Sequence, residues 1–138
     1  MALRSLLLDT NAYSAFKRGQ PEAVEILSHA PVIGLDSIVL GELLAGFVGG
    51  TREAWNRQQL EEFCASSRVH RFPVDDRTAE HYAVIYNELK QKGRPIPTND
   101  MWVAASALRN DLALFTLDGH FRYIDGLVCG WKLDDFLL

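Results

Sequence analysis

The stretch LRSLLLDTN, residues 3–11, decides the fold of this chain. Its run Leu3–Leu8 is short and nearly continuously apolar, as is typical of a strand buried on both faces of a parallel sheet. Asp9 ends the run, and Thr10 and Asn11 then open a short helix towards Lys17. The stretch therefore predicts a strand, an acidic strand end and a helix, which is the opening unit of an α/β domain.

The same alternation continues to the end of the chain. Further strands are expected at Val32–Leu35, Val69–Phe72, Leu112–Leu117 and within Leu127–Leu133. Helices are expected at Pro21–His29, from Asp36 or Ser37 to Ala45, from Thr51 to Ser66, from Asp75 or Asp76 to Gly93, and from Thr98 or Asn99 to Arg109. We therefore expect one domain over residues 1–138, with a mostly parallel sheet covered by helices on both faces.

Composition narrows the class of protein. A chain of 138 residues fits one domain of common size, and its net charge of −4 argues against nucleic-acid binding through a broad basic face. No apolar run reaches the roughly 20 residues of a membrane span, and the amino-terminal segment does not resemble a signal peptide. We expect a soluble, cytoplasmic protein. Cys64 and Cys129 lack metal-binding spacing and are expected to be reduced thiols, and the four histidines show no zinc spacing.

Four acidic residues stand where a strand should end or a helix should begin. Asp9 and Asp118 follow predicted strands, Asp100 lies in the first turn of a predicted helix, and Glu42 lies about one turn into another. The carboxyl ends of parallel strands meet at one edge of a sheet, which is also where open α/β sheets bind ligands. We therefore expect the four carboxylates at that edge, provided that the first and fourth strands are neighbours.

Such a cluster needs a counter-charge. Two like charges about 4 Å apart repel by roughly 4 kcal/mol at an effective dielectric constant of about 20. Mg²⁺ or Mn²⁺ relieves this repulsion, because both ions prefer oxygen ligands. Thr116 and Asn11 are supporting candidates: the hydroxyl of Thr116 could orient a carboxylate or a metal-bound water, and Asn11 could bond such a water or cap a helix.

Each acid also has a structural interpretation. Asp9 could cap the helix that follows it, Asp100 could interact with a helix dipole, and Asp118 could simply form a turn. Glu42 could lie on a solvated stripe of its helix, although apolar residues flank it. Capping suits Asp36, Asp75 and Asp76 better than catalysis, and no catalytic role is assigned to them.

Three basic residues close to Asp100 in the sequence could bind the phosphodiester backbone of a substrate. They are Arg94, Lys90 and Lys92, for which a solvated helix end is the structural alternative. Trp102 could stack on a base, although packing in the core suits it better.

The segments LLLDTN, GELLAG, PTNDMWVAA and TLDGHF resemble, in this order, the four acidic motifs of PIN-domain ribonucleases, and most of all the VapC-type toxins of toxin–antitoxin pairs. The resemblance implies a three-layer α/β/α sandwich and an endoribonuclease dependent on Mg²⁺ or Mn²⁺. Asp9, Glu42, Asp100 and Asp118 match the acidic quartet of the family, and Thr116 matches the polar residue often found before the fourth acid. The resemblance also implies hydrolysis that leaves 5′-phosphate and 3′-hydroxyl ends, a homodimer and a cognate antitoxin.

Three rival interpretations use the same pattern. A haloacid-dehalogenase-type phosphatase needs an aspartate two residues after its nucleophile, where this chain has Asn11. A phosphorelay receiver domain needs an acidic pair after the first strand and a lysine at a strand end. A catalytically inactive PIN-like module that binds RNA or protein is the remaining alternative, but such a module has no need for four crowded carboxylates.

Overall fold

A computed structural model describes all 138 residues, Met1–Leu138. Its centre is a five-stranded parallel sheet in the order β3-β2-β1-β4-β5. The strands are β1 (Leu6–Leu8), β2 (Ile33–Asp36), β3 (Val69–Phe72), β4 (Ala113–Phe115) and β5 (Cys129–Gly130). β1 and β4 are neighbours, paired from Leu6 with Ala113 to Leu8 with Phe115, which is the pairing on which the predicted acidic edge depended.

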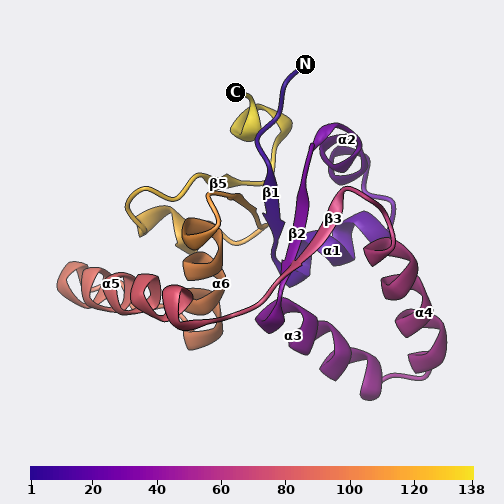
Figure 1. The fold of residues 1–138 in the computed structure, drawn as a ribbon, viewed down its shortest axis with the longest axis horizontal. Helices are drawn as coiled ribbons and strands as arrows, with labels where there is room; N and C mark the ends of the chain where they lie inside the picture. The colour runs from indigo at the N-terminus through magenta and orange to yellow at the C-terminus, as the bar shows by residue number, and fades with distance from the viewer.

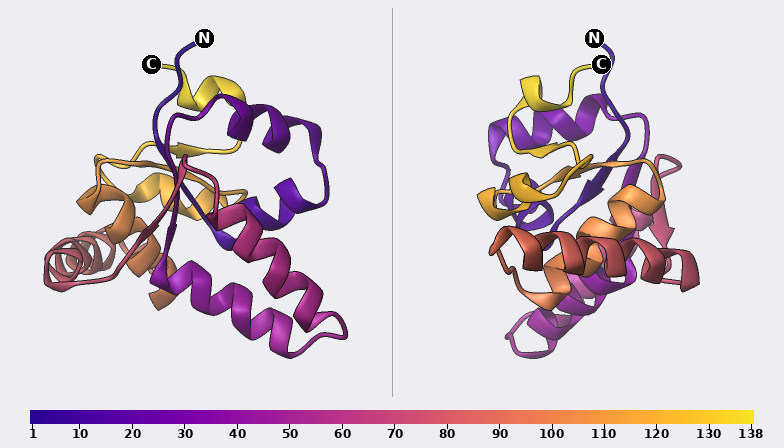
Figure 2. Two further views of the ribbon diagram at one scale, coloured as in Figure 1. Left: turned by 45° about the vertical axis from the view of Figure 1, so that its right-hand side comes forward. Right: turned by 90° about the vertical axis from the view of Figure 1, so that its left-hand side faces the viewer.

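Six α-helices and two short 3₁₀ helices surround the sheet. They are α1 (Thr10–Lys17), α2 (Pro21–His29), α3 (Ser37–Val48), α4 (Glu53–Cys64), α5 (Asp76–Lys92), α6 (Thr98–Arg109), η1 (Gly119–Tyr123) and η2 (Leu133–Phe136). The fold class predicted from the sequence is confirmed, as α1 and α2 lie on one side of the sheet and α5 and α6 on the other (Figures 1 and 2). No helix is both long and apolar enough to cross a membrane.

The order of the strands creates a switch point between β1 and β4. The chain moves outward from β1 to β2 and β3, then returns through α5 and α6 to place β4 on the other side of β1. Because parallel crossovers are right-handed, this reversal puts the later helices on the opposite face. Open α/β sheets bind ligands at such a reversal, at the carboxyl ends of the strands.

Several predicted boundaries were wrong by a few residues. The run Leu3–Leu8 divides in two, because Leu3 forms an antiparallel bridge with Leu137 while only Leu6–Leu8 joins the sheet. Neither Thr98 nor Asn99 caps α6: Pro97 occupies the cap position, with no side-chain hydrogen bond. The two cysteines are free and partly buried, as expected.

Candidate active site

The register of β1 against β4 places two of the acids side by side at the carboxyl edge of the sheet. The backbone N–H of Asp9 donates to the carbonyl of Phe115 at 2.9 Å, so Asp9 follows β1 just where β4 ends. Asp118 comes three residues after Phe115. In Figure 1 this edge lies between the α3–α4 pair on one side and the α5–α6 pair on the other.

Asp9 is the most buried member of the set, with 5% of its surface exposed. One carboxylate oxygen accepts the backbone N–H of Thr10 at 2.8 Å, and the other accepts the hydroxyl of Thr116 at 2.8 Å. Burial raises the pKa of Asp9, and the charges of Glu42 and Asp118 raise it further, against the lowering effect of the two hydrogen bonds. Asp9 also caps α1, so the capping interpretation is correct as far as it goes.

Thr116 connects Asp9 to the Asp118 loop. Its fully buried hydroxyl donates to Asp9 and accepts the backbone N–H of Asp118 at 3.1 Å. Asn11 fixes the intervening residue, since its side-chain oxygen accepts the N–H of Leu117 at 3.0 Å. The prediction that Asn11 could cap a helix was wrong, because Asp9 occupies the cap position of α1. The side chain of Asn11 instead holds the loop after β4.

Glu42 is held from both of its neighbouring helices. The hydroxyl of Thr10 donates to one carboxylate oxygen at 2.7 Å, and the amide of Asn99 donates to the other at 3.4 Å. The side chain is partly buried, so it does not lie on a solvated stripe. Neither contact could be foreseen from local sequence patterns, because Thr10 and Asn99 are 32 and 57 positions away from Glu42.

Asp100, Asp118 and His120 form the tightest group. Their ligand atoms all lie within 4.8 Å of one another. Nε2 of His120 lies 2.8 Å from a carboxylate oxygen of Asp100, and Nδ1 lies 3.5 Å from Asp118. Burial raises the pKa of Asp100, as does the charge of Asp9, while His120 lowers it.

Sequence reasoning missed His120. The histidines lack zinc spacing, and the signal that indicates His120 is its position two residues after a strand-end acid, in LDGH. The 3₁₀ helix η1 turns this residue back towards the start of α6. Asp100, Asp118 and the imidazole make up the compact group, and Asp9 lies close enough for its charge to interact with those of Glu42, Asp118 and Asp100.

His120 also provides a test of whether the site suits a cation. Its Nε2 atom is buried and makes no correctly oriented hydrogen bond, although Asp100 is close. A divalent ion between the two carboxylates and this nitrogen would give the atom a partner and neutralise the acids, so the residues fit a metal.

The basic residues near the site differ in availability. Lys92 is engaged within the protein: its Nζ donates to Asp125 and to the carbonyl of Tyr123, both at 2.7 Å, and lies 3.4 Å from Glu88. The guanidinium of Arg94 lies over the ring of Tyr123, 4.4 Å from its centroid, on an exposed residue.

Lys90 is exposed. Trp102 is half-buried and stacks on Tyr82 of α5, with ring centroids 4.1 Å apart. Its ring therefore packs against a neighbouring helix at the margin of the core and not inside it.

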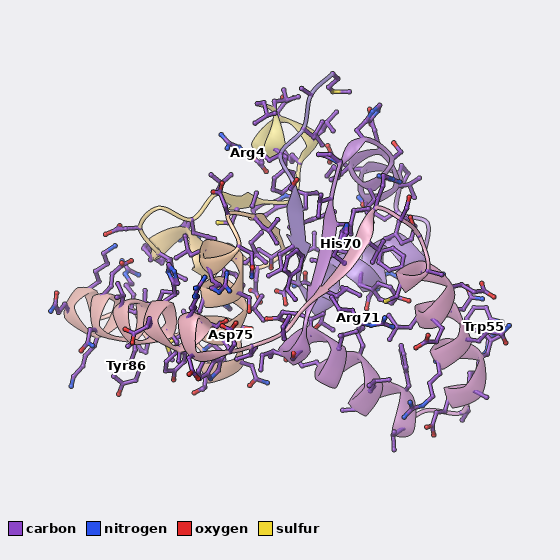
Figure 3. All side chains as sticks on the ribbon, in the orientation of Figure 1. Arg4, Trp55, His70, Arg71, Asp75 and Tyr86 are labelled. Atoms are coloured by element: carbon purple, nitrogen blue, oxygen red, sulfur yellow. The ribbon has the colours of Figure 1, made fainter.

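Two of the three acids that were expected to act as helix caps do so. Asp36 caps α3, and Asp75 forms a capping box with Thr78 at the start of α5, at the position labelled in Figure 3. Asp76 is an exposed residue of the first turn of α5. None of the three joins the compact group.

Comparison with known proteins agrees with this geometry. Ribonuclease VapC5 of Mycobacterium tuberculosis is 27% identical over 120 residues, 87% of each chain. Ribonuclease VapC2 of Rickettsia felis is 29% identical over 127 residues, 88% of this chain and 93% of the relative. The crystal structure of VapBC2 from Rickettsia felis bound to a DNA fragment from its promoter superimposes with a TM-score of 0.79 at 25% identity, over 92% of this chain and 98% of that chain. The sequence model of the family described as PIN domain matches residues 6–127 of this chain. On this evidence the chain belongs to the PIN domain family.

Proposed function

We propose that this protein is a divalent-metal-dependent endoribonuclease that hydrolyses RNA phosphodiester bonds and acts as the toxin of a toxin–antitoxin pair. The observation that carries the proposal is the meeting of Asp9, Glu42, Asp100 and Asp118, together with His120, at the switch point of the sheet. Support comes from relatives that are named VapC ribonucleases and that match this chain over most of their length.

Asp100, Asp118 and His120 would hold the ion, which is Mg²⁺ or Mn²⁺ in this proposal. The ion would supply charge neutralisation at the scissile phosphate and an activated water. Thr116 and Thr10 hold the carboxylates of Asp9 and Glu42 in fixed positions, so these groups need no reorganisation to orient a water and to balance charge. Without neutralisation, the same carboxylates would repel a phosphodiester. The products would carry 5′-phosphate and 3′-hydroxyl ends.

Partners follow from the same family likeness. A cognate antitoxin is proposed because VapBC complexes from several organisms superimpose on this chain, as that of nontypeable Haemophilus influenzae does with a TM-score of 0.78. A homodimer is proposed on the family resemblance. For the RNA backbone, Arg94 and Lys90 are favoured over Lys92, whose ammonium group is occupied by Asp125.

The test is incubation of antitoxin-free protein with total cellular RNA, with Mg²⁺, with Mn²⁺ and with EDTA, followed by mapping of the new ends. We expect discrete cuts with 5′-phosphates only when a divalent ion is present. Asp100→Asn serves as the matched inactive variant, since it retains the size of the side chain and removes its charge. Cleavage that persists in EDTA, or in Asp100→Asn, would contradict the proposal.

A further inference from the structure

A pocket adjoins the candidate active site on the side of β5. It has a volume of about 320 Å³ and shares Asp118 with the compact acidic group. The rest of its lining comes from η1, from β5 and from the segment that follows β5, and consists of Gly119, Arg122, Cys129, Gly130, Trp131, Lys132 and Asp135. We call it the β5 pocket.

The sheet register explains why the two sites are neighbours. β5 runs parallel to β4, with Phe115 opposite Gly130, and the N–H of Thr116 donates to the carbonyl of Gly130 at 2.9 Å. Trp131 therefore leaves its strand at the same edge of the sheet and beside the strand from which Asp118 leaves. A ligand at the acidic group that extended towards β5 would meet Trp131 next.

The pocket wall is fixed before any ligand binds. One carboxylate oxygen of Asp135 accepts the backbone N–H groups of Trp131 and Lys132, at 3.0 and 2.9 Å. Gly130 makes room for this carboxylate, because a Cβ atom at that position would overlap it. The backbone that carries the indole is thus held in place, which lowers the entropy cost of using the indole for binding.

Three chemical surfaces face a ligand here. Trp131 is 43% exposed, which leaves much of an indole uncovered next to the site. Lys132 is exposed and belongs to none of the ion pairs of the structure. Arg122 is anchored to the carbonyl of Gly119 at 2.9 Å and to the hydroxyl of Tyr123 at 2.8 Å.

We propose that the β5 pocket binds an unpaired nucleobase of the RNA, one next to the scissile phosphate, through stacking on Trp131. A base suits the pocket better than a phosphate does, because the carboxylate of Asp135 would repel an anion, while its oxygen that does not bond the backbone of Trp131 and Lys132 can accept an N–H group from a base edge. Lys132, on the rim, would contact the adjoining phosphate. Single-stranded RNA is commonly read in this way, with splayed bases stacked on aromatic rings. The inference rests on the proposed ribonuclease function, since it takes Asp118 to mark the cleavage point.

The first experiment measures binding of short labelled oligoribonucleotides, (A)₁₂, (C)₁₂ and (U)₁₂, by fluorescence anisotropy in Ca²⁺ or in an Asp9→Asn background, so that the probes stay intact. Stacking on one aromatic ring contributes about 1–3 kcal/mol, so Trp131→Ala should weaken binding by about 5- to 150-fold. Trp131→Phe should recover most of the affinity. The matched control is Trp55→Ala, because Trp55 is similarly exposed, at 48%, but lies on α4, far out on the other side of the molecule (Figure 3).

A second experiment separates stacking from a merely structural role. Abasic sites are introduced one at a time into a cleavable RNA, and KM and kcat are measured for the wild type and for Trp131→Ala. One abasic position near the cut should raise KM in the wild type and have little effect in Trp131→Ala, because the stacking partner is already missing.

The proposal is overturned if every abasic penalty is the same in both proteins, or if Trp131→Ala binds the probes as Trp55→Ala does. If the wild type cuts RNA and either result is found, the pocket assignment fails while the ribonuclease function stands. If total RNA remains uncut with every divalent ion, the ribonuclease function fails, and a Trp131-dependent affinity for the oligonucleotides would then support base binding alone.

Discussion

Two buried strand ends of this protein look alike and behave differently. Asp36 ends β2 and Asp9 leaves β1, and each caps the helix that follows. Asp36 is completely buried and accepts the N–H of Val39 at 2.8 Å and the hydroxyl of Ser106 at 2.7 Å. Its carboxylate thus has one backbone donor and one hydroxyl donor, the same kind of pair that Asp9 has.

The difference lies in the neighbouring charges. Burial raises the pKa of both groups, but only Glu42 adds a repulsive charge at Asp36, whereas Glu42 and Asp118 both do so at Asp9, whose charge in turn acts on Asp100. β2 lies between β1 and β3, which precede and follow it in the chain. β1 lies between β2 and β4, at the point where the order of the strands reverses. An aspartate at the end of a buried strand is therefore a structural cap at Asp36 and part of a charged site at Asp9. The position of each strand in the sheet makes the difference.

The largest expected effect comes from matched amide substitutions at these two positions. Asp9→Asn should lower kcat for RNA cleavage by at least about 10²- to 10³-fold, the size seen when one preorganised electrostatic group is lost. Asp36→Asn should leave kcat within a few-fold, because asparagine caps a helix as well as aspartate does. Single-turnover cleavage of one RNA by both variants checks this. Equal losses would show that the contrast between the two strand ends has no functional meaning.

Metal affinity should distinguish His120 from an ordinary surface histidine. Imidazole favours Mn²⁺ and later transition metals over Mg²⁺, so His120→Gln should weaken Mn²⁺ binding by about tenfold and Mg²⁺ binding by less. His70→Gln is the control, since His70 is exposed on β3, as Figure 3 shows. Titration calorimetry with each ion gives the affinities directly. Identical constants for the two variants would remove His120 from the ligand set.

Replacing Asp36 should lower the stability of the protein more than its activity. Asp36→Ala removes the cap of α3 and leaves the buried hydroxyl of Ser106 without its acceptor, with an expected cost of about 2–4 kcal/mol in unfolding free energy. Urea denaturation at neutral pH measures the loss. Cleavage per folded molecule should stay near the wild-type value, and a specific loss of kcat would move Asp36 into the active site.

The smallest effect concerns pH without metal. The pKa values of Asp9, Asp36 and Asp100 lie above their ordinary value of 3.8 in the folded protein. Over the interval between 3.8 and those raised values, the folded state binds more protons than the unfolded state. Stability in EDTA should therefore increase as pH falls through the folded pKa values and decrease as pH rises.

Saturating Mn²⁺ should flatten or reverse this slope, because metal binding needs the deprotonated acids. Melting temperatures measured across the pH range, with and without the ion, provide the check. A metal-free protein that loses stability steadily on mild acidification would contradict the raised pKa values.

The sequence was informative wherever the signal was local. Asp9 and Asp118 each end an apolar run, and Asp100 follows a Pro-rich loop, so strand and helix ends could be located from neighbouring residues. The parallel sheet followed from the alternation of elements. The edge that these acids share followed from the geometry of parallel strands alone.

What the sequence could not show depends on contacts between distant segments. Three such contacts join residues that no periodicity relates. They are the hydrogen bond from Thr10 to Glu42, the contact of His120 with Asp100 and the ion pair of Lys92 with Asp125. The bridge between Leu3 and Leu137 shortened the first strand for the same reason. Side-chain partners across elements depend on packing, which local propensity does not determine.

The two ends of the chain meet on the side of the sheet opposite the acids, where Leu138 donates its N–H to the carbonyl of Ala2 at 3.1 Å and both termini come together in Figure 1. A short peptide joining them would close the backbone into a ring, and new ends could be opened at the exposed Gly49-Gly50 turn. Reporter domains or affinity handles attached to Met1 or Leu138 would likewise lie on the side of the molecule away from the acidic group.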